Sequence, residues 1–499
     1  MRRLLRGGAS LLVCILSACD LAPAYAPPVV AVPSGFKESV DWTTATPQDA
    51  VARGPWWQMF GDPTLDQIED QVGIANQDLE VALARYDEAR ADAKSAQADY
   101  YPSVDAGGSV SRAGLSPEAP NSLPNRTYYN YSLGLDFSYE IDVWGRVRNQ
   151  AKAGVALEQA SAGDLATVSL SLHAELATDY FILRGDDAQQ EVLDRTVDNY
   201  RKALELTKAR FTAGYAARPD VSAAEAQYES AKTEATEIRL KRTNLEHAIA
   251  VLTGQPPEGF TLPPGALQTV PPDVAPVLPA TLLERRPDIA AAERRVAAAN
   301  ADIGVAKAAY FPAFNLNALF GVQAAVPSRF FTAPAEAWSL GPTTVLNLLD
   351  GGKRRALNDR ALAAHEEAAA QYRQTVLIAY REVEDSLASL HLLARETATQ
   401  QAAVDAARES AAQAERLYTG GLENYYNVIV AQDVELGARL AEVDIQTRRM
   451  TADVALIKAL GGGWDSKTGL NNDPQTAMTM SSPEARAIRA VSPESRPAP

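Results

Sequence analysis

The segment at residues 128–140, YYNYSLGLDFSYE, alternates between apolar side chains and polar or small ones. A period of two is typical of a β-strand whose two faces meet different surroundings. The apolar and aromatic face carries Tyr129, Tyr131, Leu133, Leu135, Phe137 and Tyr139. In a water-soluble sandwich this face would pack against a second sheet, so the rest of the sequence must supply one.

The sequence contains only four segments with strand character, at residues 103–111, 128–141, 313–321 and 337–349. These segments have 9 to 14 residues, which is long enough for tilted strands that cross a bilayer, since such strands need about 9 to 11. Four strands leave two open edges, which hydrocarbon does not tolerate, so several chains must share one barrel. Three copies give about 12 strands, with the apolar face toward lipid and the polar face around a wet lumen. The alternative is a soluble sheet that covers a helical bundle.

The chain repeats itself at an offset of about 210 residues. The tripeptide YYP at 100–102 corresponds to YFP at 310–312, and Arg85 corresponds to Arg295. Each half reads as a helix, a strand pair and a long helical stretch. The expected helices lie at about 64–100 and 281–310, and the long stretches at about 147–253 and 352–460. This pattern predicts a first repeat at 63–270 and a second at 271–464.

The long stretches have apolar residues at alternating spacings of three and four, which is typical of a coiled-coil seam. In the first stretch these are Leu193, Val197, Tyr200, Leu204, Thr207 and Phe211. Each stretch is interrupted once, at 214–219 and at 420–426, where a glycine can end one helix and let the chain reverse. Folded into a helix pair, such a stretch has arms of roughly 80 Å.

The amino-terminal segment MRRLLRGGASLLVCILSAC has three arginines, a short apolar stretch and then small residues. It predicts a signal peptide at 1–18, and LSAC resembles a bacterial lipobox, in which the cysteine becomes the lipidated first residue. Cys19 is therefore the expected lipidation site, and Cys14 leaves with the signal. Residues 19–62 read as a tether and 465–499 as a disordered tail. An aspartate after the cysteine, as Asp20 is, tends to retain lipoproteins in the inner membrane of enteric bacteria, but the barrel argument outweighs it.

A formal net charge of −16 disfavours nucleic acid as a partner. The sequence also lacks the patterns of an enzyme, since it has no HExxH, no GxSxG, no P-loop and no dinucleotide fingerprint. The four histidines, His173, His247, His365 and His391, occur singly in helical stretches and are expected to be surface or seam residues. We therefore expect no catalytic residue, no cofactor and no metal site.

Two long segments resemble a known family. PWWQMFGDPTLDQIEDQVGIANQDLEVALAR, which begins at Pro55, and LLERRPDIAAAERRVAAANADIGVAKAAYFP at 282–312 are similar to segments of the TolC/OprM superfamily of outer-membrane efflux lipoproteins, NodT branch. The CDLAPAY segment at Cys19 and the LGGGW segment at 460–464 extend the resemblance, which covers about residues 14–465.

The resemblance implies a homotrimer in which a 12-stranded β-barrel in the outer membrane continues into a long α-helical barrel in the periplasm. Such a tube docks on a periplasmic membrane-fusion adaptor and an inner-membrane pump of the resistance-nodulation-division type, and it is a passive exit duct for drugs or other small molecules. Two alternatives stay open. One is the outer-membrane duct of a type I protein secretion system, and the other is a periplasmic coiled-coil scaffold without a pore.

The resemblance also assigns a role to the interrupted helices, because these turns form the periplasmic tip that is closed at rest. In the family an apolar residue after the second turn is followed four positions later by an acidic one. These positions fall on Tyr426 and Val430, so the acidic ring is missing there, and Asp433 or Asp220 could replace it. The alternative is that the two aspartates cap helices.

Three glycines complete the expected site. Gly214, Gly420 and Gly421 are expected to permit the turns, and the resemblance adds a role in adaptor docking.

Overall fold

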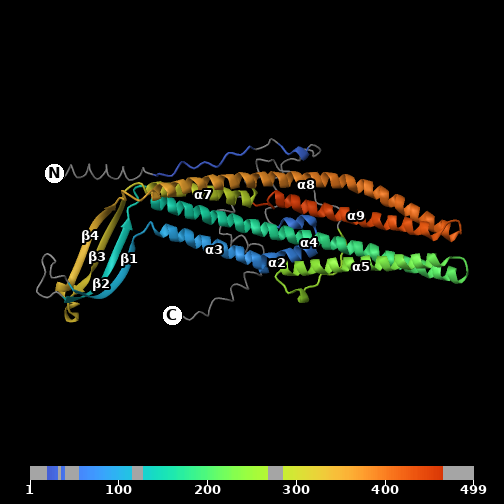
Figure 1. The fold of residues 1–499 in the computed structure, drawn as a ribbon, viewed down its shortest axis with the longest axis horizontal. Helices are drawn as coiled ribbons and strands as arrows, with labels where there is room; N and C mark the ends of the chain where they lie inside the picture. The colour runs from blue at the N-terminus through green and yellow to red at the C-terminus, as the bar shows by residue number, and fades with distance from the viewer. Residues whose placement is uncertain (1–19, 32–34, 40–54, 115–126, 268–284, 465–499) are drawn as a thin grey trace. The chain divides into compact units, whose positions relative to one another are not determined.

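The computed structural model describes residues 20–31, 35–39, 55–114, 127–267 and 285–464 (Figure 1). The expected signal peptide, the lipidation site Cys19 and the expected disordered tail lie outside these residues. The chain divides into two compact units. The first unit comprises Met1–Val29, Arg85–Ser161 and Ala291–Arg373, and the second comprises Val30–Ala84, Ala162–Ala290 and Gln374–Pro499. The division in space therefore runs across both halves of the sequence.

The first unit contains one antiparallel sheet with the strand order β1-β2-β3-β4 (Figure 1). Its strands are β1 (Ser103–Gly114), β2 (Thr127–Glu140), β3 (Ala313–Ala324) and β4 (Glu336–Val345). The four expected strands are confirmed, but β1 and β3 each extend three residues further than expected. The fourth strand ends at Val345 and not at 349, so Leu346 and Leu348 are not part of the sheet.

The strand register sorts the side chains of all four strands onto two contrasting faces. Leu135 lies between Ala106 and Phe320, and Phe320 lies opposite Trp338, so these side chains share one face. The other face carries the polar and small residues Ser103, Asp105, Ser109, Asn130, Ser132, Asp136, Asn315, Asn317, Gln323 and Thr343. The alternation that is visible in β2 is therefore a property of the whole sheet.

Two helical hairpins make up much of the second unit, and their two long helices begin in segments of the first (Figure 1). One hairpin joins α4 (Arg146–Thr212) to α5 (Arg218–Leu252), and the other joins α8 (Lys353–Thr419) to α9 (Tyr425–Ala459). The interruptions in the sequence pattern are thus confirmed as turns. The arms are unequal, however. Both long helices have 67 residues and both short helices have 35, which correspond to about 100 Å and about 50 Å and not to equal arms of 80 Å.

The seam predicted on α4 is buried along most of its length. Leu193, Tyr200, Leu204 and Thr207 are buried, whereas Phe211, at the end of the helix, is 39% exposed. Leu193 packs with Ala235 and Ile238 of α5, and partly buried leucines of α9 complete this cluster. Burial of one such leucine contributes about 1.5 to 3 kcal/mol, so the seam stabilises the pairing of the hairpins.

The first helix differs from the expected continuous element at 64–100, because it is broken into α2 (Pro63–Ala75) and α3 (Gln77–Ala98). Asn76 between them is extended, and its side-chain oxygen accepts the N–H of Leu79 at 3.0 Å. Its amide nitrogen donates to the carbonyl of Leu252 at 2.8 Å. The break therefore provides a helix cap and a link to the end of α5.

In the described ranges, the remaining elements are α7 (Pro287–Ala308) and five short 3-10 helices. These are η1 (Lys37–Ser39), η2 (Trp56–Phe60), η3 (Pro257–Gly259), η4 (Pro327–Arg329) and η5 (Ala333–Ala335). Across the described ranges, no helix is both long enough and apolar enough to cross a bilayer.

Candidate functional site

The two hairpin turns have the same backbone geometry. Gly214 and Gly421 have φ values of 81° and 74°, in the left-handed region that favours glycine. The N–H of Tyr215 donates to the carbonyl of Arg210 at 2.8 Å, and the N–H of Leu422 donates to that of Leu417 at 2.9 Å. With the bonds from the glycine N–H groups to the carbonyls three residues earlier, each turn is a Schellman motif that ends a 67-residue helix.

The third predicted glycine, Gly420, lies in the same turn but is not in the left-handed region. A Cβ atom there would approach the carbonyl oxygen of Arg416 to 3.3 Å, which requires a small adjustment. The turn therefore depends on Gly421 for its backbone conformation and much less on Gly420.

Asp220 lies at the start of α5. Its carboxylate accepts the N–H of Ala217 at 2.9 Å, which satisfies one of the free amides at the helix start. Asn424 does the same for α9, where its side chain accepts the N–H of Asn427 at 3.2 Å. The contact of Asp220 is that of a helix cap, the second of the two roles expected for it.

A buried cluster holds the ends of the two hairpins together. It consists of Leu204, Val221, Ala224, Tyr418, Tyr425 and Val428, and so draws on all four helices. The ring centroids of Tyr418 and Tyr425 are 5.1 Å apart. The guanidinium of Arg210 lies 4.5 Å from the centroid of the Tyr418 ring and donates to the Tyr418 carbonyl at 3.2 Å. This cluster gives the hairpin ends a defined mutual position.

Asp433 of α9 reaches the other hairpin. Its Oδ1 accepts hydrogen bonds from the Gln227 amide at 3.2 Å and from the Tyr200 hydroxyl at 3.4 Å. Burial raises the pKa of Tyr200, and the carboxylate of Asp433 raises it further, so the hydroxyl stays protonated and available as a donor. All three residues line a groove of about 590 Å³. The sequence singled out Asp433, but its partners are more than 200 residues away in the chain and carry no local signal.

Tyr426 and Val430 lie on the same face of α9 and are 68% and 44% exposed. Val434, four residues further on, continues the strip and is exposed as well. Tyr215 and Leu422 in the turns are also exposed. The repeat of apolar residues at every fourth position could have identified Val434. Tyr215 directly follows Gly214, and Leu422 directly follows Gly421.

The six residues proposed to face lipid, Tyr129, Tyr131, Leu133, Leu135, Phe137 and Tyr139, all lie on the apolar face of the sheet. Several side chains on this face are far from buried, and Trp338 is 75% exposed. In the part of the chain that the structure describes, this apolar face is therefore not packed as a soluble core.

Side chains that could hold a metal ion do not gather anywhere in the described ranges, where no group of three or more His, Cys, Asp or Glu is found. His173, which was expected at the surface or in the seam, is buried, and its Nδ1 lies 2.6 Å from Oε2 of Glu69. Burial lowers the pKa of His173 to about 4 and raises that of Glu69 well above its usual value.

Comparison with protein families gives a match to the model described as outer membrane efflux protein, over residues 70–255 and 278–462. The outer membrane protein OprJ of Pseudomonas aeruginosa is 31% identical over 477 residues, which cover 94% of this chain and 98% of OprJ. The pyoverdine export outer membrane protein OpmQ of the same organism is 32% identical and covers 91% of this chain. The match covers 95% of OpmQ.

Solved structures agree with this assignment. The outer-membrane channel OprN, at 32% identity, aligns with a TM-score of 0.82 over 89% of this chain and 100% of OprN. The open state of the Neisseria gonorrhoeae MtrE outer membrane channel, at 25% identity, aligns with a TM-score of 0.78 over 90% of this chain and 99% of MtrE. The chain therefore belongs to the outer membrane efflux protein family and is the outer-membrane channel of an efflux system.

Proposed function

We propose that three copies of this chain form a passive exit duct, in which three four-stranded sheets close into one 12-stranded barrel. The observation that carries this proposal is the sheet itself, which has one apolar face, one polar face and two edge strands, β1 and β4. Backbone groups on an open edge cannot stay unpaired in hydrocarbon. Pairing β1 of one copy with β4 of the next would satisfy both edges.

The polar face supports a wet lumen. Asp105 of β1 lies directly opposite Asp136 of β2 on this face. Two like charges at directly opposite positions are destabilising unless water solvates them. The lumen of a barrel provides that water, whereas a packed soluble core would not. The aromatic face, with Tyr129 and Phe137, would then lie against lipid.

The proposed gate lies at the ends of the two hairpins. In the proposed resting state, Tyr426 and Val430 of three copies narrow the duct, and Asp433 holds α9 to Tyr200 of α4 and Gln227 of α5. Loss of the contacts to Asp433 would let α9 move away from the other hairpin. Asp220 and the turn glycines Gly214 and Gly421 would keep the turns in shape while this happens, and Gly420 would lie at the docking surface.

Docking and transport complete the proposal. The turns, with exposed Tyr215 and Leu422, would contact a periplasmic adaptor, and an inner-membrane pump of the resistance-nodulation-division type would supply the energy. Cys19 would carry the lipid anchor. Relatives include a pyoverdine export protein and a toluene efflux pump protein of Pseudomonas putida, so we infer that the cargo is a small molecule.

Single-particle electron microscopy of the protein purified from membranes tests the assembly. The proposal expects a threefold particle with 12 strands inside a detergent belt. A monomer with a closed hydrophobic core, or a rod without a belt, would show that the chain is a scaffold without a pore.

Conductance in planar bilayers tests the gate. Asp433→Ala removes two hydrogen bonds to a charged group and should raise the open fraction by roughly tenfold. Tyr426→Ala should raise the conductance of each open event. Asp444→Ala is the matched control, because Asp444 lies on the same helix but pairs only locally with Arg448 at 2.8 Å. Equal conductance in Asp433→Ala and in the wild type would contradict the gate.

A further inference from the structure

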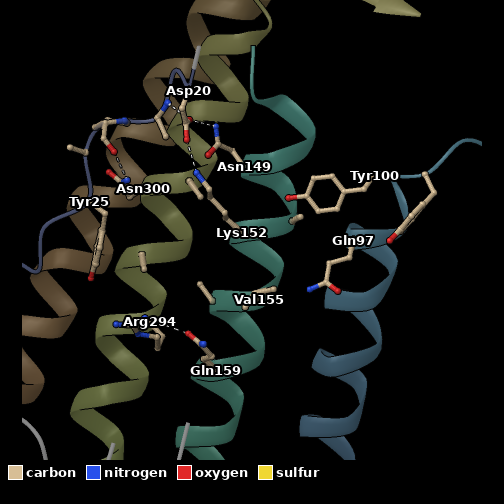
Figure 2. Close-up of a pocket in the computed structure, with 18 residues that line it drawn as sticks. Asp20, Tyr25, Gln97, Tyr100, Asn149, Lys152, Val155, Gln159, Arg294 and Asn300 are labelled. Carbon is tan, nitrogen blue, oxygen red and sulfur yellow. Dashed lines mark hydrogen bonds and ion pairs between the residues drawn. The ribbon is translucent and has the colours of Figure 1, made fainter. Parts of the chain in front are cut away.

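The first described residues of the chain, from Asp20 to Tyr25, lie against α4 and α7 in the first unit (Figure 2). The carboxylate of Asp20 accepts hydrogen bonds from the Asn149 amide at 2.8 Å and from the Lys152 ammonium at 2.5 Å. It also accepts the N–H of Ala22 at 3.1 Å, which folds the segment into a tight turn. Both oxygens of this carboxylate therefore accept hydrogen bonds.

Two further contacts hold the same segment along α7. The side-chain amide of Asn300 donates to the carbonyl of Pro23 at 2.9 Å, and the hydroxyl of Tyr25 donates to the side chain of Glu293. Backbone carbonyls of an extended segment seldom find a buried side-chain donor by accident, and Asn300 is 7% exposed. The contacts extend over six residues of the segment.

The surface under the segment is shaped to receive it. Asn149 is completely buried although it is polar, and the position opposite it on α7 is Gly304. A Cβ atom on Gly304 would lie 2.5 Å from the Asn149 amide nitrogen and 2.8 Å from the Cβ of Ala22. A side chain at this position would overlap both groups, so Ala22 or the Asn149 amide would have to shift, and the close approach favours glycine.

We propose that Asn149, Lys152, Asn300 and Gly304 form a seat for the mature amino terminus of this chain, and that this seat fixes where an acyl group on Cys19 enters the membrane. The second part of the proposal rests on the proposed lipidation of Cys19. Asp20 directly follows Cys19 in the chain, so the seat would fix the point from which an acyl group on Cys19 reaches the membrane. That point lies beside the first turns of α4, the helix that follows β2.

The charge of Asp20 is stable in this seat. Burial raises the pKa of its carboxyl, but the hydrogen bonds from Lys152 and Asn149 outweigh burial and lower the pKa to about 2. The ion pair is partly exposed, with 56% of the Lys152 side chain and 40% of that of Asp20 open to solvent. An exposed pair alone would be weak. The buried amides of Asn149 and Asn300 must therefore supply part of the affinity.

Limited proteolysis of the full-length protein purified from membranes tests the seat. Chymotrypsin cleaves after tyrosine, and mass spectrometry follows cleavage between Tyr25 and Ala26. Lys152→Ala leaves the signal region unchanged and should accelerate this cleavage by about 5- to 30-fold, because the segment leaves its seat more often. Asp20→Ala should have an equal or larger effect. Lys202→Ala is the matched control, since Lys202 lies on the same helix and pairs with Asp198 at 2.6 Å.

Wild-type cleavage rates in both Lys152→Ala and Asp20→Ala would overturn the seat. A second comparison separates the seat from the lipid. The mature chain exported behind a non-lipoprotein signal carries no acyl group and should be protected as well as the wild type. Rapid cleavage of that chain would mean that the acyl group holds the segment, which also overturns the seat. An unmodified Cys19 in the wild type, with Lys152→Ala still cleaved faster, would refute lipidation and support the seat alone.

Discussion

At the scale of single residues, His173 and Glu69 form a buried polar pair in the second unit. The ring of Trp57 stacks on His173 with a centroid distance of 4.4 Å. The Glu69 side chain is fully buried and that of His173 is 11% exposed, so burial raises the pKa of Glu69 and lowers that of His173. The two groups therefore meet as a neutral hydrogen-bonded pair and not as an ion pair.

Because burial raises the pKa of Glu69, this residue makes the free energy of unfolding depend on pH, and the direction of the change can be stated. The unfolded chain loses the Glu69 proton near pH 4.5, whereas the folded chain keeps it to higher pH, so the contribution of Glu69 to stability falls as pH rises above 4.5. The slope is up to about 1.4 kcal/mol per pH unit. Glu69→Gln keeps a neutral side chain without that proton, so its unfolding temperature should fall less between about pH 5 and about pH 8.

The histidine acts in the opposite direction, because its contribution to stability is lost as pH falls through about 4. It is present in both proteins, so the difference between them isolates Glu69. Glu88→Gln, at an exposed position, is the control. A loss of stability in Glu69→Gln that is the same at every pH would instead mean that folding does not raise the pKa of Glu69.

At the scale of elements, the turn between α8 and α9 contains two adjacent glycines, of which only Gly421 is in the left-handed region. Gly421→Ala places a Cβ in the left-handed region and should destabilise the turn by about 1 to 2 kcal/mol. Gly420→Ala, its neighbour, should change little. Hydrogen exchange at 417–424, measured by mass spectrometry, should rise about tenfold in the first variant only. Equal exchange in both variants would mean that the left-handed conformation at Gly421 is not required.

At the scale of the whole molecule, the two faces of the sheet should tolerate charge differently. Leu133 and Ser132 are neighbours near the middle of β2 and lie on opposite faces. Leu133→Arg would put a charge into lipid at a cost of about 2 to 4 kcal/mol, and should sharply reduce the trimer recovered from outer membranes. Ser132→Arg should assemble at close to the wild-type level. Equal yields of the two variants would contradict the proposed orientation of the sheet.

Much of the fold could be predicted because its signals are local. The alternation of apolar and polar residues along β2 reports its two faces directly, and glycines mark both turns. The break at Asn76 was missed, because an asparagine within a helical pattern becomes a cap only when a partner such as Leu252 lies beside it. The end of β4 was also misplaced, since leucines beyond Val345 continue the apolar pattern after the sheet has ended.

By itself, the sequence determined the strands, the seam and the positions where the long helices reverse, since periodicity and glycine act within a few residues of the chain. Only the tertiary structure decided which residues meet. Asp433 finds Tyr200 and Gln227, Glu69 finds His173, and Asp20 finds Lys152 across separations of more than 100 residues. A short segment of sequence does not encode such pairs, because they depend on how helices distant in the chain pack together.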